Sequence, residues 1–185
     1  MLIASKTPLI RAEEIRSRIA ELALEIKTAY PSGESLTVIG LLRGCYVFMA
    51  DLLRELSCLD IHVKEVDFII VSSYGSSTES SGNVKIERDI RQDIHDCHVL
   101  LVDDILDTGI TMQKLINLLN LRKPASLRSC VLLEKPERRL VDIRVDFIGF
   151  KIPDQFVVGM GLDYNQQYRE LPYITTIIKS EDTVK

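Results

Sequence analysis

The most informative part of the chain is Val99-Leu100-Leu101-Val102-Asp103-Asp104-Ile105-Leu106-Asp107-Thr108-Gly109-Ile110-Thr111. Its first four residues are apolar and predict a buried strand, which we expect to end at the two adjacent carboxylates. A short loop follows and opens a helix, whose first turn offers unpaired backbone N–H groups and the positive end of the helix dipole. The pattern therefore predicts that Thr108, Gly109 and Thr111 surround a phosphate group.

The acidic residues of this stretch must serve another purpose, because a carboxylate repels a phosphate. Asp103 and Asp104 could instead engage sugar hydroxyls or a cation such as Mg²⁺. A sugar phosphate that carries a diol fits both halves of the pattern. Taken alone, Asp107-Thr108-Gly109 would indicate only a helix cap and a turn, but the full string is much rarer.

Strands alternate with helices on both sides of this stretch. Apolar runs predict strands, and apolar residues at helical spacing predict helices that start near residues 11, 45 and 109. The strands are expected at residues 36–42, 61–72, 99–102, 127–133 and 145–150. This order predicts an α/β fold with a doubly wound, mostly parallel sheet, which binds ligands at the carboxyl ends of its strands.

The two ends of the chain break this rhythm. From Lys151 onward, prolines and glycines predict a small irregular hood lobe at about residues 151–185, which the N-terminal residues complete. The core then covers about residues 31–150, and residues 1–185 form a single domain. Residues 72–83 are small and polar, which predicts a mobile loop.

The overall composition limits the classes of function. Of the 185 residues, 46% are hydrophobic and 27% are charged, which is typical of a soluble globular domain. The net charge is −4, whereas a nonspecific nucleic-acid binder has a broad basic surface. We therefore expect small-molecule ligands and no nucleic-acid partner. Four scattered cysteines predict free thiols and a cytoplasmic location. We see neither a membrane-spanning run nor a signal peptide, and expect no membrane partner.

Several rival functions lack support in the sequence. A Walker A loop is absent, and so is a G-x-G-x-x-G loop after a strand. A receiver domain also ends a strand with an acid pair, but it would leave the residues before Val99 unexplained. His95-Asp96-Cys97-His98 enters a strand, where the side chains cannot all point one way to bind a metal. A serine hydrolase would need a G-x-S-x-G sequence, which is absent.

Residues 102–111 resemble the 5-phosphoribosyl 1-pyrophosphate (PRPP) signature of the type I phosphoribosyltransferases. Further segments narrow the resemblance to the hypoxanthine (guanine) members of that family. These segments are Leu42-Arg43-Gly44-Cys45-Tyr46, Ser73-Tyr74-Gly75, Glu134-Lys135-Pro136, Phe156-Val157-Val158-Gly159, Leu162-Asp163-Tyr164-Asn165 and Tyr168-Arg169-Glu170-Leu171-Pro172-Tyr173. They follow the family's order from about residue 36 to residue 173, so the match is more specific than any single motif.

The resemblance implies roles for the acidic strand end and the loop after it. Asp103 and Asp104 would bind the ribose hydroxyls and an associated Mg²⁺ ion. The 5′-phosphate would lie on Asp107, Thr108, Gly109, Ile110 and Thr111. Asp107 would also face N7 of the purine as the catalytic general acid and base. The alternative is that it only caps the helix.

The resemblance also implies a pyrophosphate site and a lid. Leu42, Arg43 and Gly44 would hold pyrophosphate through backbone N–H groups, with a cis peptide bond between the first two. Arg169 would make a second contact, and the alternative for both arginines is a solvated surface charge. A lid would close over the site and exclude water. The lid residues would be Ser73 and Tyr74.

Purine recognition falls to the later segments. Lys135 would donate to O6 and reject adenine, whose amino group is a donor at that position. Phe156 would stack on one face of the ring and Ile105 on the other, while the backbone of Val157 reads the Watson–Crick edge. A plain core position is the alternative for Phe156. Asp163 would bind a second Mg²⁺ ion beside pyrophosphate, unless its turn makes it structural.

The family resemblance thus implies Mg²⁺-dependent transfer of the phosphoribosyl group from PRPP to N9 of hypoxanthine or guanine. This purine-salvage reaction would give IMP or GMP and pyrophosphate, in a homodimer or homotetramer. Two alternatives stay open, a regulatory RNA-binding protein on the same fold and a catalytically silent sugar-phosphate binder. Many relatives carry Glu at Asp103, a smaller residue at Cys45 and an aromatic at Met160. These departures leave the balance between hypoxanthine and guanine open.

Overall fold

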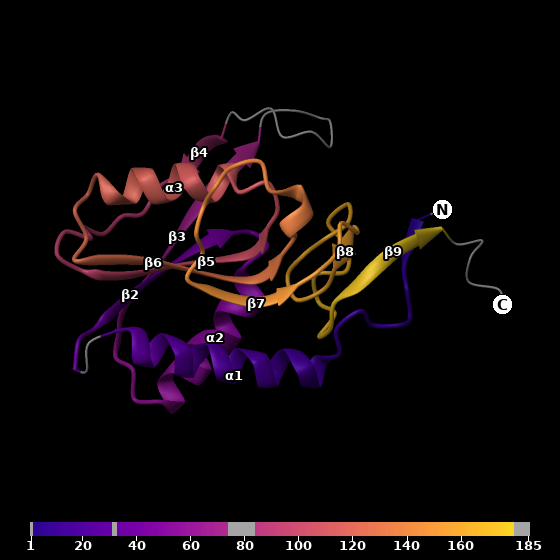
Figure 1. The fold of residues 1–185 in the computed structure, drawn as a ribbon, viewed down its shortest axis with the longest axis horizontal. Coiled ribbons are helices and arrows are strands. Elements are labelled where there is room, and N and C mark those ends of the chain that lie inside the picture. The colour runs from indigo at the N-terminus through magenta and orange to yellow at the C-terminus, as the bar shows by residue number, and fades with distance from the viewer. Residues whose placement is uncertain (1, 31–32, 74–83, 180–185) are drawn as a thin grey trace.

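The computed structural model describes residues 2–30, 33–73 and 84–179. Its main sheet has six strands in the order β4-β3-β2-β5-β6-β7 (Figure 1). Every neighbouring pair is parallel except β3 and β4. The strands are β2 (Leu36–Leu42), β3 (Val63–Ser73), β4 (Val84–Arg88), β5 (His98–Leu106), β6 (Ser126–Glu134) and β7 (Phe147–Lys151). The predicted mostly parallel α/β sheet is confirmed.

Helices cover both faces of this sheet. The helices α1 (Ala12–Ala29) and α2 (Tyr46–Cys58) lie on one face, and α3 (Ile110–Asn120) lies on the other (Figure 1). Alternate residues of β5 serve the two sides: Leu100 and Val102 pack in the core beneath α1 and α2, whereas Val99 and Leu101 pack in the core beneath α3. Because both faces are covered, the central strands are apolar along their length, which is why they were recognisable in the sequence.

The acidic strand β5 is longer than the sequence predicts. The expected strand ended at Val102, but the observed one continues through both carboxylates to Leu106. Its pairing with β2 stops where Val102 faces Gly40. Its pairing with β6 continues until Leu106 faces Glu134. Backbone pairing on one side keeps the acidic segment extended. The predicted end of the strand is therefore wrong, and the two carboxylates are strand residues.

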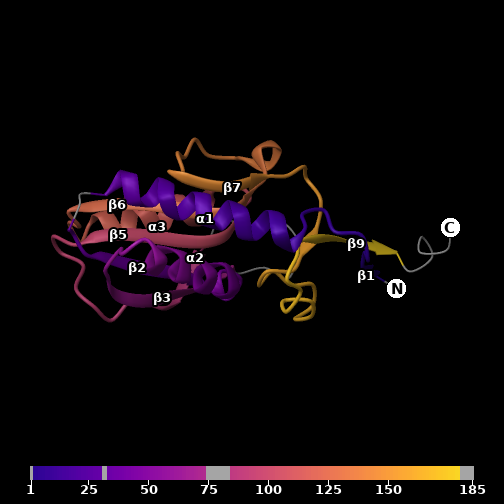
Figure 2. The ribbon, with the colours of Figure 1, turned by 90° about the horizontal axis from the view of Figure 1, so that it is seen from below.

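A second sheet forms beyond the carboxyl ends of the main sheet (Figure 2). Its strands run in the order β1-β9-β8, and both pairings are antiparallel. The strands are β1 (Leu2–Ala4), β8 (Val157–Val158) and β9 (Thr175–Lys179). The Thr175 hydroxyl ties the two ends of the chain together by donating to Ser5 O at 3.0 Å. The predicted hood lobe thus contains a regular sheet, which the sequence did not reveal because its partners lie far apart in the chain.

The polar segment at residues 72–83 joins β3 to β4. Its first two residues, Ser72 and Ser73, belong to β3, and residues 74–83 lie outside the described residues. The strand β4, which was not predicted, pairs antiparallel with β3. Among the described residues, no helix is long and apolar enough to cross a membrane.

Candidate active site

Two adjoining cavities lie where the carboxyl ends of the main strands meet the hood lobe. Their volumes are about 240 Å³ and about 480 Å³. Residues shared by both walls join them into one site, and these are Arg43, Gly44, Asp104, Ile105 and Asp107. The position agrees with the rule that open α/β sheets bind ligands beyond the carboxyl ends of their strands.

The loop between β5 and α3 lines the smaller cavity. Thr108, Gly109 and Thr111 are among its lining residues, whereas Ile110 is not. Gly109 is the N-cap of α3 and has a φ of 83°, a left-handed conformation that favours glycine. The N-terminus of α3 therefore opens on the cavity, with the backbone N–H groups and the dipole suited to an anion.

The acid pair lies at the two cavities, with Asp103 lining the smaller one and Asp104 lining both. Asp103 is buried and its Oδ1 accepts the Asp104 N–H at 2.9 Å, while Asp104 Oδ1 accepts the Ile105 N–H at 2.8 Å. Burial raises the pKa of both carboxyls, and the neighbouring Asp104 charge raises the pKa of Asp103 further. Ionising the pair is therefore unfavourable until a cation or hydroxyl donors face it.

The turn after β2 forms the wall opposite the acid pair. The peptide bond between Leu42 and Arg43 is cis, as the family resemblance implies. Gly44 leaves no room for a side chain, because an added Cβ would lie 2.5 Å from Asp104 Cγ. The hood lobe reaches the same turn: Gly161 has a φ of +100°, and a Cβ there would meet the carbonyl group of Gly44. The turn is thus packed between the acid pair and the hood.

Asp163 and Arg169 join the site from the hood side and form an ion pair. The guanidinium of Arg169 contacts Asp163 Oδ1 at 2.7 Å and donates to Gly161 O, also at 2.7 Å. Both side chains line the larger cavity. Arg169 is therefore not a freely solvated surface charge, and its closest carboxylate partner is Asp163.

The larger cavity ends at Lys135 and Phe156. Lys135 follows β6 directly and is only 7% exposed, although lysine is rarely buried. Phe156 is 53% exposed and meets Tyr164 edge to face at 5.5 Å between ring centroids. It is therefore not a core residue. Ile105 and Val157 line the same cavity, so all four residues expected at a purine lie around it.

Two charged residues of this site were not predicted from the sequence. Arg138 Nε lies 2.6 Å from Asp107 Oδ1, and its NH1 lies 3.5 Å from Asp154 Oδ2. The charges of Asp107 and Asp154 raise the pKa of Arg138. A signal was present: Pro136 after a strand favours a tight turn, and a 3₁₀ turn places residues i and i+3 on one side. Arg138 closes such a turn, the 3₁₀ helix at Pro136–Arg138, and is three residues after Lys135.

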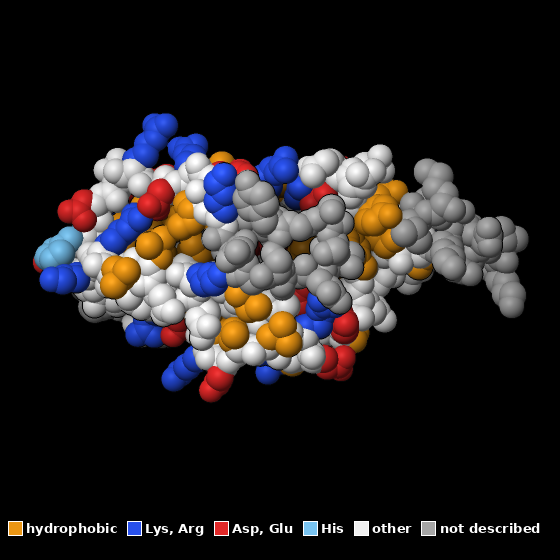
Figure 3. Space-filling model, turned by 90° about the horizontal axis from the view of Figure 1, so that it is seen from above, with side chains coloured by type: hydrophobic (Ala, Val, Ile, Leu, Met, Phe, Trp, Pro, Cys, Tyr) orange, Lys and Arg blue, Asp and Glu red, His pale blue; other side chains and the backbone are white. Residues whose placement is uncertain are grey.

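Of the two proposed lid residues, the structure describes only the backbone of Ser73. The backbone of Ser73 ends β3, and Tyr74 lies outside the described residues. On the described part of the face that carries α3 and β4, basic and acidic side chains are interspersed (Figure 3).

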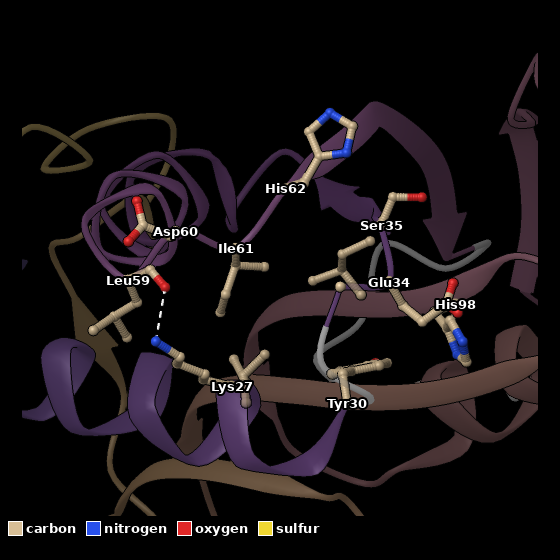
Figure 4. Close-up of a pocket in the computed structure, with 12 residues that line it drawn as sticks. Lys27, Tyr30, Glu34, Ser35, Leu59, Asp60, Ile61, His62 and His98 are labelled. Atoms are coloured by element: carbon tan, nitrogen blue, oxygen red, sulfur yellow. Dashed lines mark hydrogen bonds between the residues drawn. The ribbon is translucent and has the colours of Figure 1, made fainter.

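A separate cavity of about 290 Å³ lies at the amino ends of the strands (Figure 4). Several of its polar groups already have partners in the fold. Lys27 Nζ donates to Leu59 O at 3.0 Å, and the Tyr30 hydroxyl donates to Val99 O at 2.9 Å. His98 Nδ1 bonds the Ser126 hydroxyl at 2.7 Å, so it does not converge with the other histidine of the segment 95–98. The acid pair and the loop that opens α3 lie at the other end of the sheet.

Comparisons with known proteins agree with this architecture. The Phosphoribosyl transferase domain family matches residues 9–165. The hypoxanthine phosphoribosyltransferase of Escherichia coli (strain K12) is 50% identical over 171 residues, which cover 92% of this chain and 94% of that protein. The hypoxanthine-guanine phosphoribosyltransferase of Bacillus subtilis (strain 168) is 45% identical and covers 90% of this chain and 89% of its own.

Solved structures give the same result. The hypoxanthine phosphoribosyltransferase of Trypanosoma cruzi, in complex with the product IMP, has a TM-score of 0.85 and 40% sequence identity, covering 96% of each chain. A hypoxanthine phosphoribosyltransferase of Staphylococcus aureus has a TM-score of 0.86 and 42% identity, covering 97% of this chain and 95% of its own. The chain belongs to the phosphoribosyltransferase family.

Proposed function

We propose that the chain is a purine-salvage enzyme that transfers the phosphoribosyl group of PRPP to N9 of hypoxanthine or guanine. The products are IMP or GMP and pyrophosphate. The observation that carries this proposal is the joined pair of cavities. One holds a helix N-terminus suited to an anion beside an acid pair of which Asp103 is buried, and the other holds a buried lysine and an exposed aromatic ring. The relatives that act on hypoxanthine or guanine, and the neighbour that binds IMP, support the same substrates.

The reaction breaks one bond and forms another at C1′ of the ribose. The C1′–O bond to pyrophosphate breaks, and its electron pair leaves with pyrophosphate. The lone pair on N9 forms the new C1′–N9 bond, and the purine loses one ring proton. Asp107 lines both cavities, and its carboxylate takes this proton at N7 and returns it in the reverse direction.

The residues of the smaller cavity bind PRPP. Backbone N–H groups of Asp107, Thr108, Gly109, Ile110 and Thr111 hold the 5′-phosphate at the start of α3. Asp103 and Asp104 accept the ribose hydroxyls, and as C1′ gains positive charge their carboxylates stabilise it. The cis turn of Leu42, Arg43 and Gly44 holds pyrophosphate, together with Arg169 from the hood. The lid would begin at Ser73 and Tyr74.

The residues of the larger cavity select the base. Lys135 donates to O6 of a 6-oxopurine, whereas the amino group of adenine would place a donor against a donor. Phe156 stacks on one face of the ring, Ile105 packs on the other, and the backbone of Val157 pairs with the Watson–Crick edge. Because Lys135 is buried, a base that leaves it without an acceptor loses affinity.

The site fits Mg²⁺ as a cofactor that binds together with the substrate. Asp103 and Asp104 would hold one Mg²⁺ ion and Asp163 a second, because carboxylate oxygens are ligands that Mg²⁺ prefers. The buried Asp103 carboxylate also favours a cation beside it. In the described part of the chain no three His, Cys, Asp or Glu residues form a metal-binding group, and we expect substrate oxygens to supply the remaining ligands. When bound, Mg²⁺ would neutralise the charge that develops on pyrophosphate.

The two lobes serve one site, because the hood backbone at Gly161 packs on the turn at Gly44. We therefore take residues 1–185 as one functional domain, with a core at about 31–150 and a hood from the N-terminal residues and about 151–185. The family resemblance favours a homodimer or homotetramer, and the four scattered cysteines favour a cytoplasmic location.

The test is nucleotide synthesis by the purified protein with PRPP, hypoxanthine and MgCl₂. We expect one pyrophosphate for each IMP, loss of turnover with EDTA, and recovery with added Mg²⁺. Asp107→Asn should lower kcat by about 10²- to 10⁴-fold with little change in KM for PRPP. The exposed Asp142 supplies the control Asp142→Asn. Equal losses in kcat and PRPP binding would make Asp107 a binding residue, and absence of turnover by the unmodified chain would contradict the function.

A further inference from the structure

Arg138 forms an ion pair with one oxygen of the Asp107 carboxylate. Its Nε lies 2.6 Å from Asp107 Oδ1, both of these atoms are buried, and the contact is one of charge without hydrogen-bond geometry. The Asp107 side chain as a whole is nevertheless 40% exposed, so its exposed surface belongs to atoms other than Oδ1. Because Asp107 lines both cavities, the carboxylate is held at one oxygen while the other is left for a ligand.

Asp154 links Arg138 to the buried lysine. Its Oδ2 lies 3.5 Å from Arg138 NH1, and its Oδ1 lies 3.6 Å from Lys135 Nζ. The four side chains therefore form a row of alternating charge: Asp107, Arg138, Asp154 and Lys135. Arg138 and Lys135 are also joined through the backbone, because the Arg138 N–H donates to Lys135 O at 3.2 Å.

The two ends of this row are Asp107, which is assigned to N7 of the purine, and Lys135, which is assigned to O6. N7 and O6 lie on the same edge of a 6-oxopurine, so the groups that contact them must keep a fixed spacing. Asp107 comes from the loop after β5, and Lys135 comes from the end of β6, so the sheet alone does not fix their side chains. Arg138 and Asp154 bridge them.

We propose that Arg138 is a positioning residue that orients Asp107 for proton transfer at N7, and that Asp154 couples it to Lys135 at O6. The inference rests on the proposed function, because it assumes the roles given to Asp107 and Lys135. Arg138 acts through the Asp107 carboxylate and makes no contact with the reacting atoms. A carboxylate without this partner could rotate away from the base, and a misplacement of about 1 Å can cost about 100-fold in rate.

The neighbouring residue shows that this arrangement is specific to Arg138. Arg139 turns away from Asp107 and contacts Glu134 Oε1 at 2.6 Å. Asp154 is 44% exposed and Arg138 is 38% exposed, so changing either one should leave the hydrophobic core intact. Variants of the two residues are therefore expected to fold.

The decisive experiment is a double-mutant cycle on Asp107 and Arg138, measured by IMP synthesis at saturating hypoxanthine with PRPP as the varied substrate. Arg138→Leu should lower kcat by about 10- to 100-fold, with KM for PRPP within about twofold of the unmodified value. Arg138→Lys should restore part of the loss, because it keeps a cation beside the carboxylate. In the Asp107→Asn background, Arg138→Leu should change kcat by less than about twofold, because the group it orients is gone.

Arg144→Leu is the matched control, since it removes the same charge from an exposed position in the same connection between β6 and β7. The inference is overturned if Arg138→Leu lowers kcat no more than Arg144→Leu does, or if it causes the same loss in the Asp107→Asn background. Thermal unfolding of every variant shows whether a loss of kcat is caused by misfolding. If Arg138→Leu does not fold, the cycle is repeated with Arg138→Lys in its place. If the unmodified chain forms no nucleotide, the proposed function fails and this inference fails with it. If it does form nucleotide, only the role of Arg138 is in question.

Discussion

Substituting Gly44 tests the packing that holds the pyrophosphate turn against the acid pair. The Cβ of Gly44→Ala would lie 2.5 Å from Asp104 Cγ, and closer still to Asp104 Oδ2. Because carbon atoms pack at about 3.5–4.0 Å, the carboxylate or the turn must move by about 1 Å or more. A shift of about this size in a reacting geometry costs about 100-fold in rate. We therefore expect kcat/KM for PRPP to fall by about 100-fold.

The assay is steady-state IMP synthesis with PRPP as the varied substrate, together with a thermal melt of each variant. Overpacking at one site costs about 1–3 kcal/mol, so Gly44→Ala should remain folded at 25 °C. Gly33→Ala makes the same chemical change where no atom lies within 4 Å of the added Cβ, although its φ is +87°. It should lose about 1–2 kcal/mol of stability and keep the unmodified rate. If kcat/KM of Gly44→Ala stays within threefold of the unmodified value, the packing of Gly44 against Asp104 does not control the site.

Three further substitutions test other parts of the account. Asp103→Asn should abolish activity yet raise the melting temperature, more at pH 8 than at pH 5. Burial and Asp104 raise the pKa of Asp103, so the unmodified chain loses stability as the pH rises above the unfolded value of about 3.9. Lys135→Met should lower kcat/KM for hypoxanthine by about 10- to 100-fold and weaken discrimination against adenine, as measured with each base in turn. Leu56→Ala should lower the free energy of unfolding by about 2–5 kcal/mol in urea titrations, with an unchanged rate per folded molecule.

Local patterns in the sequence were enough to predict the parallel strands of the main sheet and the loop that opens α3. The apolar run at 36–42 became β2 at Leu36–Leu42, and the helix expected from about residue 109 begins at Ile110 with Gly109 as its N-cap. These features depend on neighbouring residues, whose spacing and turn chemistry the sequence records directly. The loop that follows β5 could be recognised for the same reason.

Features that depend on distant partners were not predictable in this way. The extension of β5 to Leu106 depends on pairing with β6, and β9 depends on β1 at the other end of the chain. The contacts of Arg138 with Asp107 and Asp154 require three separate segments to meet. Single-sequence patterns identify residue types at such positions, but not which charges become neighbours.

The most direct test of the proposed function is a competition among bases. Hypoxanthine, guanine, xanthine, adenine and uracil would be offered together to the purified protein with PRPP and Mg²⁺, and the nucleotides separated and measured against pyrophosphate. We expect IMP or GMP in amounts equal to pyrophosphate, with no AMP or UMP. Formation of UMP alone, or of no nucleotide although PRPP binds, would contradict it.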